Sequence, residues 1–205
     1  MYVGKGITRI AAALATITLA GLPLSACQQR TLWHATDISG AVPALALSMT
    51  RANDGQSVDA ADYRGRVTLL YFGYTFCPDA CPLTLSNAAH VLRNLGASAD
   101  GVRLLFVTVD PNRDTPAVLK QYIAAFDSHI DGLRGSPDEL VSLARRYRVA
   151  YSVDPRGANG GYEVTHSSGI YVFDQAGNAR LLISSLSTSH PDIDGTTSDL
   201  RALLR

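Results

Sequence analysis

The chain has 205 residues, of which 46% are hydrophobic and 18% charged, and its 18 basic side chains balance its 18 acidic ones. This length suits one domain of ordinary size preceded by a leader, and the composition is that of a globular protein rather than a disordered one. The sequence has no basic patch or arginine-rich stripe, which argues against nucleic acid as a partner. Three cysteines are too few for a disulfide-stapled scaffold.

The first 26 residues have the pattern of an export signal. Lys5 and Arg9 form a basic start, and the apolar run over 10–24 is too short and too interrupted for a comfortable membrane span. The run ends in Leu-Ser-Ala before Cys27, which resembles the bacterial lipobox. The resemblance implies cleavage before Cys27 and lipidation of its thiol. An ordinary signal peptide that happens to contain a cysteine, or an uncleaved anchor, is the alternative interpretation.

These features predict three parts: a lipoprotein signal peptide over 1–26, a lipid-anchored tether over 27–40 and one domain over 41–205. We therefore expect the protein in a bacterial cell envelope, held at a membrane by its lipid, with the domain facing the periplasm or the outer surface. A monomer is expected.

The domain is predicted to open with a β-hairpin and to continue with buried strands separated by a helix. A strand over 44–49 and a return arm over 56–58 flank an Asn-Asp-Gly turn. Continuous apolar runs over 67–72 and 102–109 predict two strands buried on both faces. Helical spacing predicts a helix between them, beginning near Cys77 or Pro82 and ending at Gly96.

Capping residues and turn signals predict the second half of the domain. Asp114 or Thr115 can cap a helix with Pro116 near its first position, and Ser136 opens the next helix. The remaining predicted elements are a short strand over 149–153, an exposed loop over 154–161, a hairpin with arms over 168–173 and 179–183, and a final helix over 198–204.

This order of elements predicts an α/β fold. Two strands joined by a helical crossover indicate a parallel pair, and the late hairpin adds antiparallel strands to the same sheet. The expected architecture is a central mixed sheet flanked by helices, with an added N-terminal β-hairpin. A cysteine pair at the carboxyl end of the first core strand makes this arrangement thioredoxin-like.

Cys77 and Cys81 are the most informative residues of the chain. They follow a buried strand and a glycine-containing turn that opens a helix. At a helix N-terminus, unpaired N–H groups and the positive end of the dipole lower thiol pKa values, so we expect acidified thiols here. Residues four apart share one helix face. The pair can therefore close a disulfide or hold a soft metal ion as thiolates.

Three blocks of sequence resemble the signature blocks of the Sco/SenC family of copper-binding proteins. They cover residues 71–82, 109–115 and 164–168, and the likeness spans 41–183. It implies a thioredoxin-like fold that binds one copper ion, with the family's ligands falling on Cys77 and Cys81 in the first block and on His166 in the third.

The resemblance also implies a function. Family members are metallochaperones rather than enzymes, and they help load copper into the CuA centre of cytochrome c oxidase subunit II; another copper-acceptor protein could take that place. Some are thought to act as thiol reductants for that centre. A site with two thiolates and one imidazole suits copper and leaves an open face for an acceptor thiol, whereas a structural zinc site is closed by four protein ligands.

Position in the chain favours His166 over the other histidines. It lies just before the strand over 168–173, and the loop entering that strand faces the cysteine helix in a thioredoxin-like sheet. The four remaining histidines are expected in the tether, along the first helix, near a helix end and in a late loop: His34, His90, His129 and His190.

The residues around the predicted ligands also have predicted roles. Asp110 is either a carboxylate near copper that does not bind it or a turn aspartate that satisfies backbone N–H groups. We expect Arg113 and Asp114 to form a local salt bridge and helix cap. Thr165 stands where family members often carry an aspartate, which could alter copper affinity without removing a ligand.

The main alternative function is that of a thiol–disulfide oxidoreductase. Cys77 and Cys81 would then be the redox-active pair that reduces an acceptor's cysteines. Thioredoxin-type enzymes usually have two residues between the cysteines and this chain has three, and a pure dithiol exchanger does not need His166. A peroxidase of the peroxiredoxin type is disfavoured because its Pro-x-x-x-Thr-x-x-Cys pattern is missing.

Overall fold

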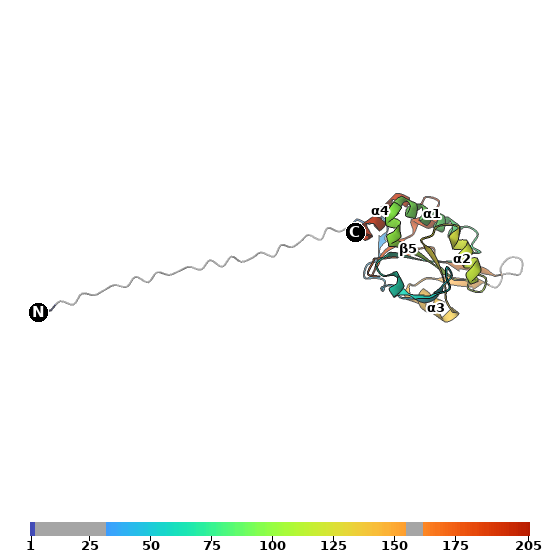
Figure 1. The fold of residues 1–205 in the computed structure, drawn as a ribbon, viewed down its shortest axis with the longest axis horizontal. Helices are drawn as coiled ribbons and strands as arrows, with labels where there is room; N and C mark the ends of the chain where they lie inside the picture. The colour runs from blue at the N-terminus through green and yellow to red at the C-terminus, as the bar shows by residue number, and fades with distance from the viewer. Residues whose placement is uncertain (3–31, 155–161) are drawn as a thin grey trace. The chain divides into compact units, whose positions relative to one another are not determined.

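The computed structural model describes residues 1–2, 32–154 and 162–205. The chain divides into two units after Thr31, and the larger unit, Leu32–Arg205, is the folded domain (Figure 1). Cys27 and all but the first two residues of the predicted signal peptide lie outside the described residues, as does nearly all of the predicted loop over 154–161. None of the helices in the described part of the chain combines the length and the apolar character that crossing a membrane requires.

A mixed sheet forms the centre of the domain. Over the described residues it has eight strands in the order β1-β10-β9-β4-β5-β6-β2-β3, with β4, β5 and β6 parallel and the other neighbours antiparallel. Two further strands, β7 and β8, pair with each other in a separate antiparallel sheet. The strands are β1 (Thr36–Asp37), β2 (Ser48–Arg51), β3 (Ser57–Asp59), β4 (Val67–Gly73), β5 (Val102–Thr108), β6 (Ile130–Arg134), β7 (Tyr151–Asp154), β8 (Glu163–His166), β9 (Ile170–Phe173) and β10 (Ala179–Ile183).

Helices cover both faces of this sheet. Figure 1 shows α1 and α4 together on one side and α3 on the opposite side. The α-helices are α1 (Ala80–Leu95), α2 (Pro116–Ala124), α3 (Pro137–Arg146) and α4 (Ile193–Leu203). Because α1 joins β4 to β5 and α2 joins β5 to β6, each is the crossover that a parallel pair requires. The predicted mixed sheet with flanking helices and an N-terminal hairpin is confirmed.

Strand β4 lies at the centre of the core, and the turn that carries the cysteines follows it in the chain. All seven of its residues are buried, as its uninterrupted apolar sequence predicts. It pairs in register with β5 from Val67 opposite Val102 to Gly73 opposite Thr108. The carboxyl ends of both strands therefore meet at the same edge of the sheet, where the cysteine turn begins.

The predicted helix caps fix the helix boundaries. Thr115, rather than Asp114, caps α2, with its hydroxyl accepting from the Val118 N–H at 3.3 Å. Ser136 and Glu139 form a reciprocal capping box on α3. Helix α1 ends at Gly96, whose φ of +60° is a left-handed conformation that glycine adopts without steric cost.

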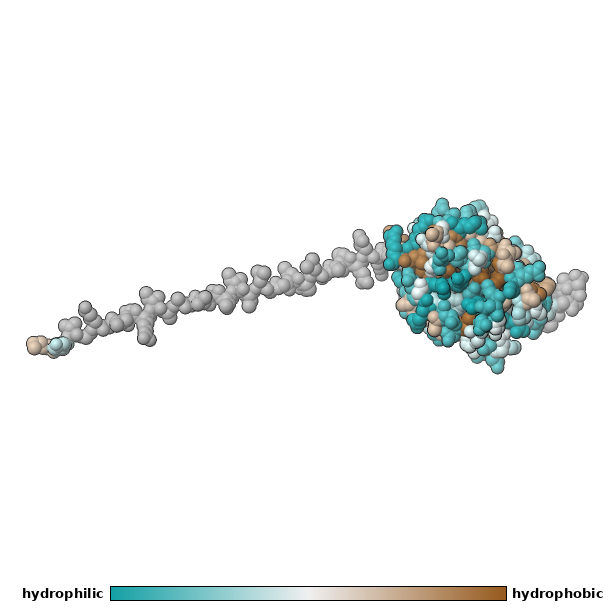
Figure 2. Space-filling model, viewed as in Figure 1, coloured by the Kyte–Doolittle hydropathy of each residue, from teal (hydrophilic) through white to brown (hydrophobic). Residues whose placement is uncertain are grey.

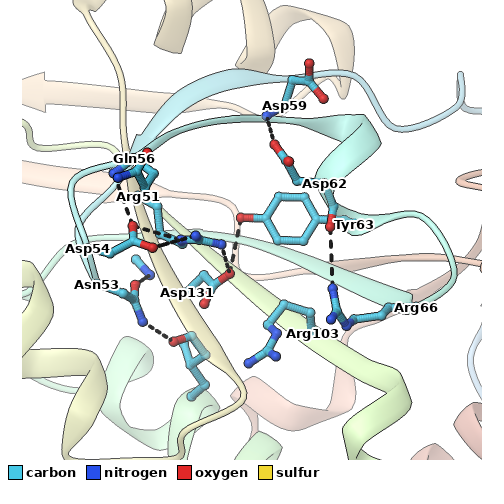
Figure 3. Close-up of polar contacts among 12 residues, drawn as sticks. Arg51, Asn53, Asp54, Gln56, Asp59, Asp62, Tyr63, Arg66, Arg103 and Asp131 are labelled. Carbon is cyan, nitrogen blue, oxygen red and sulfur yellow. Dashed lines mark hydrogen bonds and ion pairs between the residues drawn. The ribbon is translucent and has the colours of Figure 1, made fainter.

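Strand β6 was not predicted from the sequence. Polar Asp131 and flexible Gly132 interrupt its apolar pattern, yet Asp131 is only 6% exposed. Figure 3 shows how its charge is accommodated: the Tyr63 hydroxyl donates to its carboxylate at 3.2 Å, and the Arg51 guanidinium lies 3.7 Å away while also pairing with Asp54. A buried carboxylate with these partners is compatible with a central strand.

Several boundaries also differ from the prediction. The first hairpin strand begins at Ser48 rather than Ala44, and α4 begins at Ile193 because Asp192 caps it by accepting from the Gly195 N–H at 2.9 Å. Residues expected in the tether form β1, which pairs with β10. The buried Asp199 carboxylate accepts from the backbone of His34 and Ala35. The sheet therefore begins at Thr36, inside the span assigned to the tether.

Gly73 is the residue through which the sheet supports the cysteine turn. A Cβ at this position would lie 2.5 Å from Phe106 Cε2 and 3.0 Å from Cys81 Sγ. We expect Gly73→Ala to lower the free energy of unfolding by about 1–3 kcal/mol, because overpacking forces core side chains to move. Urea denaturation measures this loss.

Gly101→Ala provides the control. Its Cβ would meet only the end of the Leu204 side chain, at 2.8 Å, and that side chain can rotate away. Equal losses for the two variants would show that the close approach at Gly73 has no special role.

Candidate metal centre

The cysteine turn connects the end of β4 to the start of α1. Cys77 is partly exposed, whereas Cys81, in the first turn of α1, is fully buried, and neither forms a disulfide. The Cys81 N–H belongs to the first turn, where backbone donors have no partner within the helix, and it donates to Cys77 Sγ at 3.4 Å. This hydrogen bond at the start of α1 holds Cys77 Sγ close to Cys81.

His166 completes the group from a separate part of the chain. It is the last residue of β8, and its Nε2 lies 3.2 Å from Cys81 Sγ. Its Nδ1 lies 3.0 Å from the Ser167 carbonyl oxygen, which can only accept, so Nδ1 carries the proton. Burial lowers the pKa of His166 and favours the neutral ring. Nε2 therefore presents a lone pair to the sulfur, which is the state that a metal ligand needs.

The ligand atoms of Cys77, Cys81 and His166 all lie within 4.8 Å of one another. Metal–sulfur and metal–nitrogen bonds of about 2.3 and 2.0 Å place ligands of a three-coordinate ion roughly 4 Å apart. Within the described ranges, no fourth histidine, cysteine or carboxylate joins this group. Its donor set suits a soft or borderline cation and leaves a position open, unlike a closed four-ligand structural site.

The pKa of the Cys81 thiol contradicts the expectation that both thiols are acidified. Burial raises the pKa of its thiol to about 12, because the side chain lies in the core, where a thiolate would lose its hydration. Hydrogen bonds from the Tyr74 backbone and the Tyr71 side chain lower the pKa, but by less than burial raises it. The resting pair is therefore a protonated Cys81 and a neutral His166, and a metal ion must displace the Cys81 proton when it binds.

Aromatic rings surround the imidazole. The Tyr71 and Tyr74 rings meet it edge-on, with centroid distances of 6.0 and 5.8 Å. Tyr74 is buried, whereas Phe76, which directly precedes Cys77 in the chain, is 56% exposed. The exposed apolar surface beside Cys77 is therefore formed by Phe76.

Asp114 holds the cysteine turn in place through hydrogen bonds. Its fully buried carboxylate accepts from the Thr75 N–H at 3.0 Å, from the Thr75 hydroxyl at 2.6 Å and from the Thr108 hydroxyl at 2.5 Å. The predicted salt bridge between Arg113 and Asp114 is wrong, because Arg113 pairs with Asp110 instead. Asp114 ties the cysteine turn to the end of β5.

Asp110 is buried, with 2% exposure, and the role of its carboxylate near copper stays a prediction. Among the described residues its carboxylate accepts from the Arg113 guanidinium and from the Tyr162 hydroxyl, the latter at 2.5 Å, rather than from backbone around Pro111. It does not join the three ligand atoms. Tyr162 was missed in the sequence, where a lone tyrosine beside a glycine-rich stretch carries no recognisable signal.

The other predicted features lie as follows. Thr165 is joined to Ser152 across β7 and β8 by a hydroxyl pair at 2.8 Å, so it stabilises the hairpin that carries His166. His90 is exposed on α1, and His129 binds Asp127 and Asp100. Neither belongs to the metal-ligand group, and nor do His34 and His190.

The different burial of the two thiols predicts different reactivity. We expect iodoacetamide at about pH 8 to modify Cys77 well before Cys81, because only exposed thiols with accessible thiolate react readily. Peptide mapping by mass spectrometry at successive times measures both rates. Equal rates, or faster labelling of Cys81, would contradict the burial of that side chain.

Comparisons with known proteins agree with this geometry. The SCO1/SenC family model matches residues 49–203. The mitochondrial protein SCO2 homolog of Bos taurus is 43% identical over 119 residues, which cover 57% of this chain and 45% of that protein. The chain thus spans about half the length of the curated relatives it matches.

Solved structures share the fold. Bradyrhizobium japonicum ScoI with copper bound aligns with a TM-score of 0.70 and 36% identity, covering 80% of this chain and all of that one. Yeast Sco1 with copper bound aligns with a TM-score of 0.67 and 30% identity, covering 78% of this chain and 90% of that one. Since the family match includes the cysteine turn, β5 and β8, the chain belongs to the SCO1/SenC family and has its thioredoxin-like fold.

Proposed function

We propose that this protein is a copper-binding metallochaperone that delivers copper for assembly of the CuA centre of cytochrome c oxidase. The observation that carries the proposal is the convergence of Cys77, Cys81 and His166 within 4.8 Å. Relatives solved with copper bound, at 36% and 30% identity, support copper as the ion. The Sco family takes part in cytochrome c oxidase assembly, which supports the destination.

The donor set explains why copper would bind. Soft thiolates select Cu(I), and imidazole suits copper in either oxidation state. The Cys81 thiol, whose pKa is raised by burial, gives up its proton on binding, whereas His166 is already neutral and needs no deprotonation. Binding therefore becomes weaker as the pH falls.

The asymmetry of the site explains how copper would leave. Cys77 is partly exposed and directly follows the exposed Phe76 in the chain, whereas Cys81 is fully buried. A thiol of the acceptor would reach the ion from the Cys77 side and replace that ligand first. Cytochrome c oxidase subunit II, or another copper-acceptor protein, would supply this thiol.

A second candidate function is reduction of the acceptor's cysteines. The hydrogen bond from the Cys81 N–H to Cys77 Sγ holds the two cysteines close together, as a dithiol that closes to a disulfide requires. In that reaction the pair forms its own S–S bond, and its two electrons and two protons pass to the acceptor's disulfide, which becomes a dithiol. His166 has no required part in this exchange.

His166→Ala separates the two functions. We expect the purified, reduced protein to bind one Cu(I) per chain, and the substitution to weaken this binding by at least about tenfold, since it removes a ligand. The same variant should change the rate of thiol–disulfide exchange much less. Competition with a chromophoric Cu(I) chelator measures the affinity, and exchange with a model disulfide measures the rate.

His90→Ala is the matched control, because His90 is exposed on the helix that carries Cys81. It should leave copper affinity unchanged. Stoichiometry far below one would remove the chaperone proposal, and equal effects of His166→Ala on copper and on exchange would favour the oxidoreductase.

We also propose that lipid on Cys27 holds the protein at a membrane of the bacterial envelope, with a monomeric domain facing the periplasm or outer surface. Support comes from the small residues before Cys27 after an apolar run. In a lipoprotein-competent host, radiolabelled fatty acid should enter the native chain and not Cys27→Ser, and only the native chain should sediment with membranes. Equal labelling of both chains, or none, would refute the anchor.

A further inference from the structure

Arg113 makes an unusual set of contacts beside the metal centre. Its guanidinium carbon lies 4.0 Å from the centroid of the Tyr162 ring and 5.0 Å from that of the Phe76 ring. It lies 5.9 Å from the Tyr74 ring, which in turn packs edge-on against His166. Such cation–π contacts are strongest where the cation is partly shielded from water, and the Arg113 side chain is 28% exposed.

Polar contacts fix the same guanidinium in its plane. Its Nε donates to the Asp110 carboxylate, and its Nη1 donates to the Tyr162 carbonyl at 3.3 Å. The Tyr162 hydroxyl donates to the other oxygen of Asp110 at 2.5 Å. Because Asp110 is almost completely buried, its charge requires these partners. We call Arg113, Asp110, Tyr162 and Phe76 the arginine clamp.

The clamp joins the two chain segments that carry the ligands. Phe76 directly precedes Cys77 in the cysteine turn, and Tyr162 directly precedes β8, which ends at His166. In the described part of the chain, β7 and β8 share no backbone ladder with the eight-stranded sheet. Backbone pairing therefore does not join β8 directly to the strand before the cysteines. Its position depends on side-chain contacts and on the short link over 167–169 to β9.

We propose that Arg113 is the positioning residue of this centre: it holds β8 against the cysteine turn and so keeps His166 Nε2 within bonding reach of an ion on the two sulfurs. The inference rests on the proposed copper function. A planar guanidinium is required, because one group must stack on Tyr162 and Phe76 while donating to Asp110 and to the Tyr162 carbonyl. A lysine retains the charge for Asp110 but can neither stack as a plane nor donate in two fixed directions.

Arg113→Lys tests the inference, with Arg180→Lys as its matched control. Arg180 also lies over an aromatic ring, 5.8 Å from the Trp33 centroid, and also pairs with a carboxylate, Asp174 at 3.3 Å. Its strand, β10, is not part of the metal centre. We expect Arg113→Lys to weaken Cu(I) binding by about 10- to 100-fold, the range for groups that orient a ligand, and Arg180→Lys to leave it unchanged.

A double-mutant cycle separates positioning from general damage. If Arg113 acts through the imidazole, Arg113→Lys should have no further effect in the His166→Ala background. If it merely destabilises the cysteine turn, the loss should be as large in that background as in the native one, and the inference is overturned.

Hydrogen exchange of the copper-free protein gives a readout that does not depend on metal. Amides of Glu163–His166 should exchange faster in Arg113→Lys, whereas those of α1 should keep their native rates. Unchanged exchange in β8 would overturn the positioning role. If His166→Ala itself leaves copper affinity unchanged, the proposed function fails; if that variant binds weakly but Arg113→Lys binds normally, only the clamp fails.

Discussion

The contact between the His166 ring and the Cys81 sulfur joins residues 85 positions apart, and the chemistry of the domain depends on it. The sulfur comes from the first turn of the helix after β4, and the nitrogen comes from the end of β8 in a separate two-stranded sheet. A dithiol alone could exchange electrons with many partners. The imidazole adds a borderline nitrogen ligand to the two soft sulfurs. Together these three atoms form a donor set that Cu(I) prefers.

Burial shapes the copper-free state of this group. The raised pKa of Cys81 and the lowered pKa of His166 have the same cause, since a charge on either side chain would lose its hydration. Both groups are therefore neutral, and the core around Gly73 and Phe106 can close on Cys81 without an unpaired charge. The partly exposed Cys77 provides the access that exchange of an ion requires. A buried Cys81 and a partly exposed Cys77 together suit a site that binds an ion and then releases it.

Much of the fold could be predicted because its signals are local. The uninterrupted apolar run of β4 and the capping residues Thr115 and Ser136 identify a strand and two helix starts without tertiary information. Strand β6 could not be identified this way, since Asp131 is acceptable in a buried strand only through Tyr63 and Arg51 from distant segments. Strand β1 has two residues, and its stability comes from pairing with β10 rather than from its own pattern.

Cys77, Cys81 and His166 were predicted as ligands through a family resemblance and, for His166, through its position just before the strand over 168–173. The structure brings the three side chains together. What surrounds them could not be predicted. Arg113 has carboxylates at positions 110 and 114, and only the folded chain shows that it takes Asp110 while Asp114 turns to Thr75 and Thr108. The pKa of Cys81 depends on burial of its thiol in the folded core, which its position at a helix start in the sequence does not reveal.

X-ray absorption spectroscopy of the Cu(I)-loaded protein tests the central claim most directly, because it counts the atoms bound to the metal. The account predicts two sulfur ligands and one imidazole nitrogen, with the imidazole scattering lost in His166→Ala. A spectrum with sulfur ligands alone, identical in the native protein and in that variant, would contradict it.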